Sequence, residues 1–270
     1  SKSINNSITV VDNHYIRFPK LKQMKCHGAH RITGKIKRAT IHKNPSGSYT
    51  ATILVEDAVS ALPKTGAVVG LDMGITHLVI QSDDYKLPNK QFERALAQKK
   101  RVWQRKFARR RAQAIKTIEQ SNVAGVELKL SDFRNVEKAK QQVARINRKI
   151  ANQRNDYLHQ YTTHLVKTYD VIVMEDLKTK NLMANHHLAR SIADASWGII
   201  KTMLTYKCTW YKKELILVNP HYTSQLCAHC GENTGKKPLH VRIFDCPHCG
   251  TCDIDRDINA AINIRNKAFA

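Results

Sequence analysis

Polar and apolar residues alternate in the front part of the chain, which is the pattern of a strand with one face buried. Over residues 35–57 this pattern predicts two strands, IKRATIHK and SYTATILVED, joined by the turn sequence NPSG. In the second strand Tyr49, Ala51, Ile53 and Val55 fall on one face. We therefore expect a small antiparallel β unit at the N-terminal end.

Four continuous apolar runs further along indicate strands that are buried on both faces. The runs are AVVGLDMG, THLVIQSD, DVIVMED and ELILVN. An amphipathic helix is expected over Ser191 to Lys213, and DRDINAAINIRNKA predicts a last helix with Ile258, Ala261, Ile262 and Ala268 on its packed face. Because strands and helices follow one another in this order, the fold class is α/β.

Two long helices are predicted in the middle of the chain. Residues from Gln91 to about Gln120 contain neither Pro nor Gly, and a second helix is expected from Asp132 to about Tyr169. The second helix repeats apolar residues every seven positions from Val136 to Tyr157. We expect the two to pack as an antiparallel helical pair over about 91–169.

The charge of the chain points to a polyanionic partner. The 270 residues include 45 Lys and Arg against 22 Asp and Glu, a net charge of +23. No apolar run reaches the roughly 18 residues that a membrane-spanning helix needs, and the first residues lack a secretory signal. Nucleic acid, not a membrane, is therefore the expected partner, and the expected location is the cytoplasm of a prokaryote, in association with the nucleoid.

One stretch of the first long helix concentrates this charge. Between Lys99 and Lys116 there are nine basic residues and no acid. A solvated charged face is the ordinary explanation of such a run, but it would include acids among the bases. We therefore expect contact with a nucleic-acid backbone, and the aromatic residues Trp103, Phe107, Trp197 and Trp210 are expected in cores. The candidate binding residues are Lys99, Lys100, Arg101, Arg105, Lys106, Arg109, Arg110 and Arg111.

Four of the seven cysteines have the spacing of a zinc site. Cys227 and Cys230 form one CxxC pair, Cys246 and Cys249 form a second, and 15 residues separate the pairs. Four thiolates complete a tetrahedral Zn²⁺ shell, so the predicted site is structural rather than catalytic. Redox cysteines are the alternative, His229 and His248 are less favoured ligands, and Cys252 is a spare one. Cys26 and Cys208 are expected to be small buried residues.

Three acids stand where a rigid backbone can aim them. Asp72 and Glu175 end apolar runs, and Asp257 opens the last helix. Hard Mg²⁺ or Mn²⁺ ions prefer oxygen ligands, and a pair of ions suits phosphodiester hydrolysis. The neighbouring glycines of GLDMG would leave room for a phosphate backbone. Each acid alone could instead be a strand-end or helix-capping carboxylate, and Asp176 and Asp255 compete with Glu175 and Asp257.

Several motifs together resemble one family. The segments GLDMGI, VIVMEDL followed by KTKNL, TSQLCAHCG, FDCPHCG and DRDINAAINI occur in the order found in TnpB (OrfB) proteins of insertion sequences, relatives of type V CRISPR effectors. The resemblance extends from about Gly34 to the end of the chain. It implies an RNase H-like (RuvC) core with a mixed sheet and a zinc ribbon inserted before the third acid. It maps the first two acids onto Asp72 and Glu175, and it selects Asp257 over Asp255.

The resemblance also implies a function and a domain plan. We expect an RNA-guided, Mg²⁺- or Mn²⁺-dependent DNA endonuclease that acts on a DNA target with a guide RNA from the transposon end. The expected domains are a remnant of a β-barrel (1–62), a RuvC-like core (63–220), a zinc ribbon (221–250) and a final RuvC segment (251–270). Both the arginine-rich helix and the front β unit would help to hold the guide.

Other functions stay open at the level of sequence. A binding protein that regulates transposition would need no cleavage, although no expected metal-binding acid is missing. A transposase that performs strand transfer would share the carboxylates, but no sequence feature indicates a reader of transposon ends. The chain starts with Ser, and family members have more sequence before the first acid, so we expect a shortened form.

Overall fold

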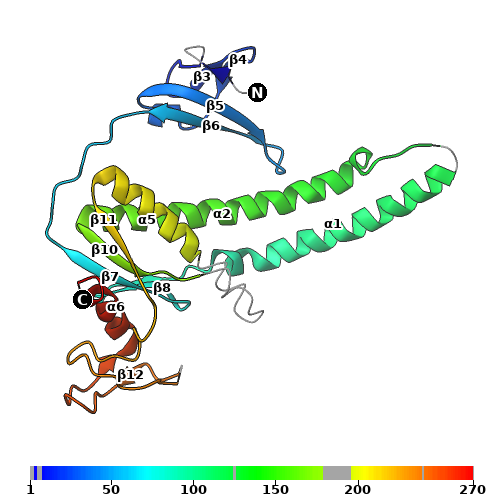
Figure 1. Ribbon diagram of the computed structural model, residues 1–270. Helices are drawn as coiled ribbons and strands as arrows, with labels where there is room; N and C mark the ends of the chain where they lie inside the picture. Colours follow the sequence, from blue (N-terminus) through cyan, green and yellow to red (C-terminus); the bar gives the residue numbers. More distant parts are fainter. Residues whose placement is uncertain (1–2, 5–7, 124–125, 179–195, 239, 270) are drawn as a thin grey trace. The chain divides into compact units, whose positions relative to one another are not determined.

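The computed structural model divides the chain into two compact units (Figure 1). The first contains the residues up to Val59 together with Leu96–Ala151, and the second contains Ser60–Ala95 and the residues from Asn152 onward. Both the helices and the mixed sheet expected of an α/β protein are present. The residues that the structure describes are 3–4, 8–123, 126–178, 196–238 and 240–269.

Two small antiparallel sheets form the N-terminal part of the first unit. Their strand orders are β1-β5-β6 and β2-β3-β4. A buried cluster that includes Ile16, Phe18 and Ala39 lies at their core. The predicted strands correspond to β5 and β6, joined by a turn in which the Gly47 N–H donates to the Asn44 carbonyl. The elements are β1 (Ser3–Ile4), β2 (Thr9–Val10), β3 (Tyr15–Phe18), β4 (Lys22–Lys25), η1 (Ala29–Arg31), β5 (Lys35–Lys43) and β6 (Tyr49–Glu56).

The two long helices form as predicted, and each runs from one unit into the other. They are α1 (Phe92–Val123) and α2 (Arg134–Thr168), connected through η2 (Leu130–Asp132). The Arg110 guanidinium donates to the carbonyl of Asn135 at 3.1 Å, as expected where antiparallel helices meet. Apolar positions of the seven-residue repeat lie inward, and the buried residues there are Val136, Ala139, Ile146 and Ile150.

A five-stranded mixed sheet forms the centre of the second unit, with the order β11-β10-β7-β8-β9. β7, β8 and β9 are antiparallel neighbours, whereas β10 pairs in parallel with both β7 and β11. Four of these strands were predicted from apolar runs. The fifth, β9, is short and ends in Pro, so it gave no such signal. The bounds are β7 (Val68–Met73), β8 (His77–Gln81), β9 (Lys86–Pro88), β10 (Val171–Glu175) and β11 (Glu214–Val218).

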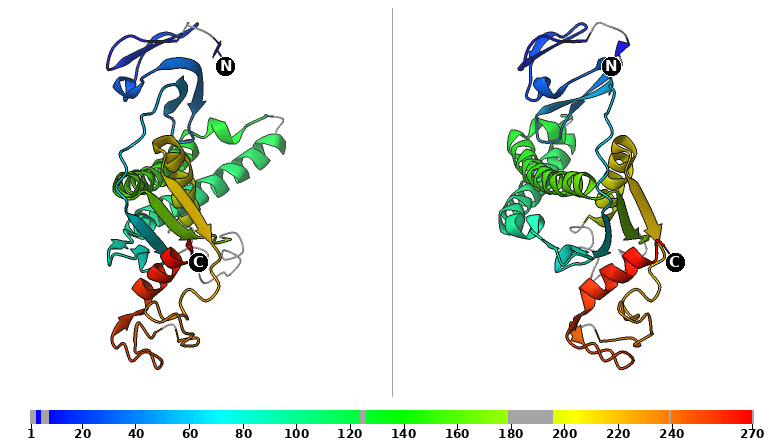
Figure 2. Two further views of the ribbon diagram at one scale, coloured as in Figure 1. Left: turned by 60° about the vertical axis from the view of Figure 1, so that its left-hand side comes forward. Right: turned by 90° about the vertical axis from the view of Figure 1, so that its left-hand side faces the viewer.

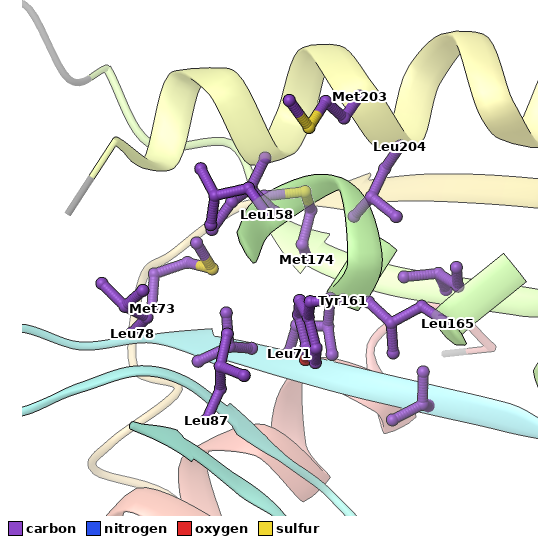
Figure 3. Packing of buried hydrophobic residues seen from close by; sticks show 14 of the residues in the cluster. Leu71, Met73, Leu78, Leu87, Leu158, Tyr161, Leu165, Met174, Met203 and Leu204 are labelled. Atoms are coloured by element: carbon purple, nitrogen blue, oxygen red, sulfur yellow. The ribbon is translucent and has the colours of Figure 1, made fainter. Parts of the chain in front are cut away.

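The hydrophobic core covers one face of this sheet (Figure 3). Because side chains alternate along a strand, Leu71 and Met73 of β7 and Met174 of β10 point to the same side. Leu158 and other residues of the C-terminal half of α2, and residues such as Leu204 of α5 (Trp197–Tyr211), pack against them. The alternate residues of β7 and β10 therefore face the other side.

Helix α6 (Arg256–Asn266) packs on that other side (Figure 2). A Cβ atom at Gly70 would lie 2.1 Å from the Ala261 carbonyl oxygen and 2.7 Å from the Arg265 nitrogen. Glycine is thus required because the α6 backbone approaches β7 at this point. The expectation that this glycine leaves room for phosphate was wrong, since the helix fills the space.

Two expectations about packing also need correction. Trp210 is 52% exposed, although Trp197 is buried as expected. On α6 the buried residues include Asn259 and Asn263, whereas Ile258 and Ile262 are only partly buried. The buried face of α6 is therefore partly polar, because it contacts backbone groups as well as the sheet. The N-terminal end of the helix predicted from Ser191 lies outside the described residues.

A small cysteine-rich segment links β11 to α6. It contains β12 (Ile243–Phe244) and β13 (Ile254–Asp255), which pair antiparallel. Cys227, Cys246 and Phe244 form part of its own buried cluster. None of the helices in the described part of the chain is long and apolar enough to cross a membrane.

Candidate active site

The sheet brings the first two predicted acids together. Met174 of β10 is paired with Leu71 of β7, so the next residues, Glu175 and Asp72, follow at neighbouring positions on parallel strands. Leu71 and Met174 belong to the core cluster on one face. Strand alternation therefore turns Asp72 and Glu175 to the opposite face, where α6 packs.

The third acid comes from the first turn of α6. Asp255 is the N-cap residue, and its carboxylate accepts hydrogen bonds from the N–H groups of Asp257 and Ile258 at 2.9 and 3.1 Å. It also forms an ion pair with Lys86 of β9. Asp255 is thus used to cap and anchor the helix. Asp257, two residues later, has a side chain that is 25% exposed and lines a cavity.

One cavity of about 300 Å³ is lined by all three acids. Together, Asp72, Glu175 and Asp257 are called the carboxylate site. The remaining lining residues come from the segment after β11, from the loop before β12 and from α6, and they are Pro220, Thr223, Ser224, Arg242, Arg256 and Ala260. Sequence elements that are far apart in the chain thus converge on a single polar cavity.

The acids of this cavity influence one another. Burial, followed by the negative charges of Glu175 and Asp257, raises the pKa of Asp72 to about 7. Burial also raises the pKa of Glu175, which is 7% exposed, while a hydrogen bond from Thr223 opposes this rise. A cavity that concentrates negative charge in this way favours a cation as its occupant.

Two arginines of the cavity were not predicted from the sequence. The Arg242 guanidinium donates to both oxygens of Asp257, at 3.2 and 3.4 Å, and its side chain is 59% exposed. Arg256 precedes Asp257 on α6. Because the chain contains 45 basic residues, neither arginine stood out. Their positions beside acids could be found only from the fold.

The donor set of the carboxylate site fits a divalent ion that prefers oxygen. Three carboxylates and the Thr223 hydroxyl are hard ligands of the type that Mg²⁺ and Mn²⁺ bind. Within the described residues, only the cysteines form a group of three or more ligand side chains as tight as 4.8 Å. The three carboxylates share one cavity but are not part of such a tight group.

The alternative second acid lies elsewhere. Asp176 is exposed and forms a 2.5 Å ion pair with Lys201, which lowers the pKa of its carboxyl group. It lines a different cavity, between the end of β10 and the end of β11. Successive side chains alternate between the two sides of a strand, so Glu175 and Asp176 point in different directions. Only Glu175 lines the cavity with Asp72.

The four cysteines with CxxC spacing are also brought together. Their sulfur atoms lie within 4.8 Å of one another, with 3.9 Å between Cys227 and Cys249 and 3.7 Å between Cys230 and Cys246. Four thiolates at about 2.3 Å from a zinc ion would be roughly 3.8 Å apart, so the spacing fits zinc. Hydrogen bonding by Thr251 lowers the pKa of the Cys249 thiol. This group is called the thiolate cluster.

The other cysteines and the two nearby histidines lie outside the thiolate cluster. Cys252 is exposed, its thiol donates to the Gly250 carbonyl, and it is not in the group of four ligand side chains. Cys208 is buried and Cys26 is partly buried. The ligand group found among the described residues contains neither His229 nor His248.

The basic residues of α1 cover more than one face of the helix. Arg101, Arg105 and Arg109 are exposed at intervals of four residues, and Lys99 and Arg111 are exposed as well. Lys106 lies 4.7 Å from the ring centre of Trp103. Lys100 and Arg110 are partly buried, and Arg110 contacts α2. Most of the predicted basic residues are therefore exposed on the part of α1 that belongs to the first unit, where a partner could reach them.

Comparison with known protein families gives the chain its relatives. A family model described as "Probable transposase" of the IS605 OrfB type matches residues 51–186, and a model described as "Cas12f1-like, TNB domain" matches residues 197–264. The chain belongs to the OrfB (TnpB) family. Together the two matched ranges include the three acids of the carboxylate site and the four cysteines of the thiolate cluster.

Two relatives of this OrfB chain are named as endonucleases. A Streptomyces pristinaespiralis protein named "Putative RNA-guided DNA endonuclease" is 38% identical over 83% of the chain. The Escherichia coli K12 protein "Putative RNA-guided DNA endonuclease InsQ" is 32% identical over 94% of the chain. The chain spans 51% and 62% of the lengths of these two relatives.

A solved structure was also found. It is the cryo-EM structure of a Cas12f1–sgRNA–target DNA complex, at 15% identity and a TM-score of 0.48, with 98% of the OrfB chain and 68% of the other chain covered.

Proposed function

We propose that the chain is the nuclease core of an RNA-guided DNA endonuclease, and that the carboxylate site holds two Mg²⁺ or Mn²⁺ ions. The observation that carries this proposal is the cavity lined by Asp72, Glu175 and Asp257. Family membership supports the reaction class, because the relatives are named as RNA-guided DNA endonucleases. When bound, the ions would activate the attacking water and stabilise the leaving oxygen.

The side chains that line the cavity have different roles in the proposed reaction. The three carboxylates supply oxygen ligands, and the Thr223 hydroxyl orients Glu175 by donating to its Oε1 atom at 2.7 Å. Arg242 and Arg256 place positive charge at the same cavity, where a DNA phosphate would bind. The burial of Glu175 limits the access of water to its side chain.

The proposal includes the fold type of the core and the second metal. We assign the second unit to the RNase H-like (RuvC) type, supported by an antiparallel β7-β8-β9 followed by two parallel strands in one sheet. The thiolate cluster would hold one structural Zn²⁺, in which four protein ligands leave no position for water.

The partners are also part of the proposal. A guide RNA and a DNA target would contact the exposed bases of α1, including Arg101, Arg105 and Arg109, through their phosphates. Sequence would then be read by base pairing. We place this activity at the nucleoid, in the cytoplasm of a prokaryote. A regulator that only binds nucleic acid would not need the three carboxylates in one cavity.

The test compares acids that are neighbours in the sequence. The chain, with RNA transcribed from its flanking DNA, is incubated with a matching DNA in Mg²⁺ or in EDTA. We expect Mg²⁺-dependent cleavage that Asp72→Asn, Glu175→Gln and Asp257→Asn each reduce by more than about 100-fold. Asp176→Asn is the matched control and should leave cleavage within about twofold, because its carboxylate lines another cavity.

Metal binding is measured in the same proteins by titration with Mn²⁺. We expect binding that is lost in Asp72→Asn and kept in Asp176→Asn. Intact DNA under every condition, together with Mn²⁺ binding that is identical in all four variants, would contradict the proposed function. Cleavage without dependence on these acids would place the active site elsewhere.

A further inference from the structure

The side chain of Glu175 is held by a residue from the segment that leads into the thiolate cluster. Thr223 lies four residues before Cys227, and its hydroxyl is 2.7 Å from Glu175 Oε1 and 3.2 Å from the Pro220 carbonyl. Thr223 is 5% exposed and Glu175 is 7% exposed, so water does not compete effectively for the shorter of these contacts. The orientation of Glu175 therefore depends on the position of Thr223.

Two buried asparagines of α6 fix that position. The side-chain amide of Asn263 donates to the carbonyls of Thr223 at 2.9 Å and Leu226 at 2.7 Å. One turn earlier, Asn259 donates to Leu226 at 2.7 Å and accepts from the Ala228 N–H at 2.7 Å. Asn259 is 1% exposed and Asn263 is 7% exposed. Both side-chain amides therefore hold the backbone of residues 223–228 by hydrogen bonds.

That piece of backbone contains a member of the thiolate cluster. Leu226 and Ala228 are the residues on either side of Cys227, whose side chain is fully buried. A metal ion held by the four sulfurs would fix this backbone, because Cys227 would be tied to Cys246 and Cys249 from the other half of the segment. Helix α6, whose two asparagines hold this backbone, also carries Asp257.

We propose that the thiolate cluster positions Glu175 and Asp257 through Thr223, Asn259 and Asn263, so that occupancy of the four-cysteine site controls the affinity of the carboxylate site for divalent ions. The inference rests on the proposed function of the carboxylate site. It makes Thr223 a positioning residue that acts through Glu175. It also makes the thiolate cluster a point at which metal loss or thiol oxidation lowers activity at a distance.

The physical basis is the cost of a misplaced ligand. Partners that orient metal-binding side chains are worth about 10–100-fold in metal affinity. The two asparagine side chains are buried and hydrogen-bond to backbone groups of Thr223, Leu226 and Ala228, so a change that breaks these bonds leaves a buried amide without a partner, which is unfavourable.

The first experiment measures Mn²⁺ affinity in three zinc-loaded variants. Thr223→Val removes the hydroxyl with little change of shape and should weaken Mn²⁺ binding by about 10–100-fold. Thr223→Ser keeps the hydroxyl and should restore binding to within about threefold. The matched control is Thr234→Val in the same segment, where the hydroxyl donates to the Gln225 carbonyl and does not reach Glu175. This variant should bind Mn²⁺ as the unmodified chain does.

The second experiment removes zinc with a thiol-specific reagent, confirms its release by metal analysis, and repeats the titrations. We expect Mn²⁺ binding to fall by at least about tenfold, and Thr223→Val to have little further effect in the zinc-free chain. An unchanged Mn²⁺ affinity after zinc release, or a Thr223→Val effect of equal size with and without zinc, would overturn the inference.

The outcomes separate this inference from the function on which it rests. If the zinc-loaded, unmodified chain shows no Mn²⁺ binding that depends on Asp72, the proposed function fails. If that binding is present and insensitive to both Thr223→Val and zinc release, the function stands and the coupling is wrong. The comparison of Thr223→Val with Thr223→Ser needs no zinc removal, so a segment that unfolds without zinc does not prevent the test.

Discussion

At the scale of single residues, neighbouring acids take different roles because of the directions in which their backbones point them. Glu175 lines the cavity with Asp72, whereas Asp176 pairs with Lys201 on the surface. Asp255 caps α6, whereas Asp257 lines the cavity from the first turn of that helix. A change of one or two positions along the chain thus separates a candidate metal ligand from a structural acid.

Lys207 shows how burial changes the behaviour of one charge. It is 5% exposed, and its ammonium group donates to the His159 carbonyl and to the hydroxyls of Thr162 and Thr163 at 2.7–2.8 Å. No acid pairs with it within the described residues, and burial lowers its pKa from 10.5 to about 8. The folded chain therefore releases this proton at a lower pH than the unfolded chain does.

This difference predicts a pH-dependent stability. Charged Lys207 destabilises the fold below pH 8, and the cost is relieved as the pH rises from about 8 to 10.5. Lys207→Met removes this cost, so its stability relative to the unmodified chain should be more favourable at pH 7.5 than at pH 9.5, by roughly 1–2 kcal/mol. Urea unfolding at both pH values measures this. The exposed Lys167→Met is the control, and an equal difference at both pH values would refute the prediction.

At the scale of elements, α6 has a larger role than its eleven residues suggest. It packs against β7, supplies Asp257 to the cavity and holds the backbone around Cys227 through Asn259. Its approach to the sheet depends on the missing side chain of Gly70. The geometry of the carboxylate site is thus set by how closely one helix can lie against one strand.

Gly70→Ala is expected to damage this contact. The new methyl group would lie 2.1 Å from a backbone oxygen of α6, and backbone cannot move aside as a side-chain end can. We expect the free energy of unfolding to fall by at least about 2 kcal/mol, as measured by denaturant titration. The same substitution at exposed Gly198, in the first turn of α5, should change the free energy of unfolding by less than about 1 kcal/mol. A neutral Gly70→Ala would show that α6 is not so closely packed.

The sequence predicted the elements whose signal is local. Continuous apolar runs indicated β7, β8, β10 and β11, and the seven-residue repeat indicated α2. The short strand β9 has no apolar run, and its place is fixed by pairing with β8. Local pattern also could not show that Asn259 and Asn263 are buried, because their partners are backbone groups more than 30 residues earlier. Their spacing of four residues on one helix face was the available signal.

Some candidate site residues could likewise be predicted from a local motif, and others only from the fold. The CxxC pairs identify the thiolate cluster from the sequence, since each pair is local and four sulfurs are needed. The resemblance to TnpB proteins pointed to Glu175 rather than Asp176, but the physical reason, which face of β10 is covered by the core, could be seen only in the fold. Arg242 and Thr223 join the cavity through the path of the segment after β11, and nothing in their immediate sequence distinguishes them from other arginines and threonines.

At the scale of the whole molecule, some basic residues form ion pairs with acids and others do not. Several lysines are paired with acids, among them Lys37 with Glu56 and Lys140 with Glu137. Arg101, Arg105 and Arg109 have no ion pair with any described residue and follow one another along α1. A polyanion would therefore gain more from these arginines than from the paired lysines.

This distinction can be measured through salt dependence. Replacing Arg101, Arg105 and Arg109 by Gln should weaken binding of a short single-stranded RNA and make the slope of log K against log salt shallower by about 2 to 3. The control replaces Lys37, Lys129 and Lys140, each of which is paired with a glutamate, and should change the slope by less than about 1. Equal changes in the two triple variants would show that total charge, not the face of α1, determines binding.

The place of α6 in the chain has a consequence for synthesis. Strand β7 with Asp72 leaves the ribosome long before the helix that must cover Gly70 and supply Asp257. Until that helix has been translated, the first two acids have no third partner and the sheet has one uncovered side. A nascent chain, or one whose translation stops before α6, would therefore lack a complete carboxylate site, and the cavity could assemble only after residue 257 has been added.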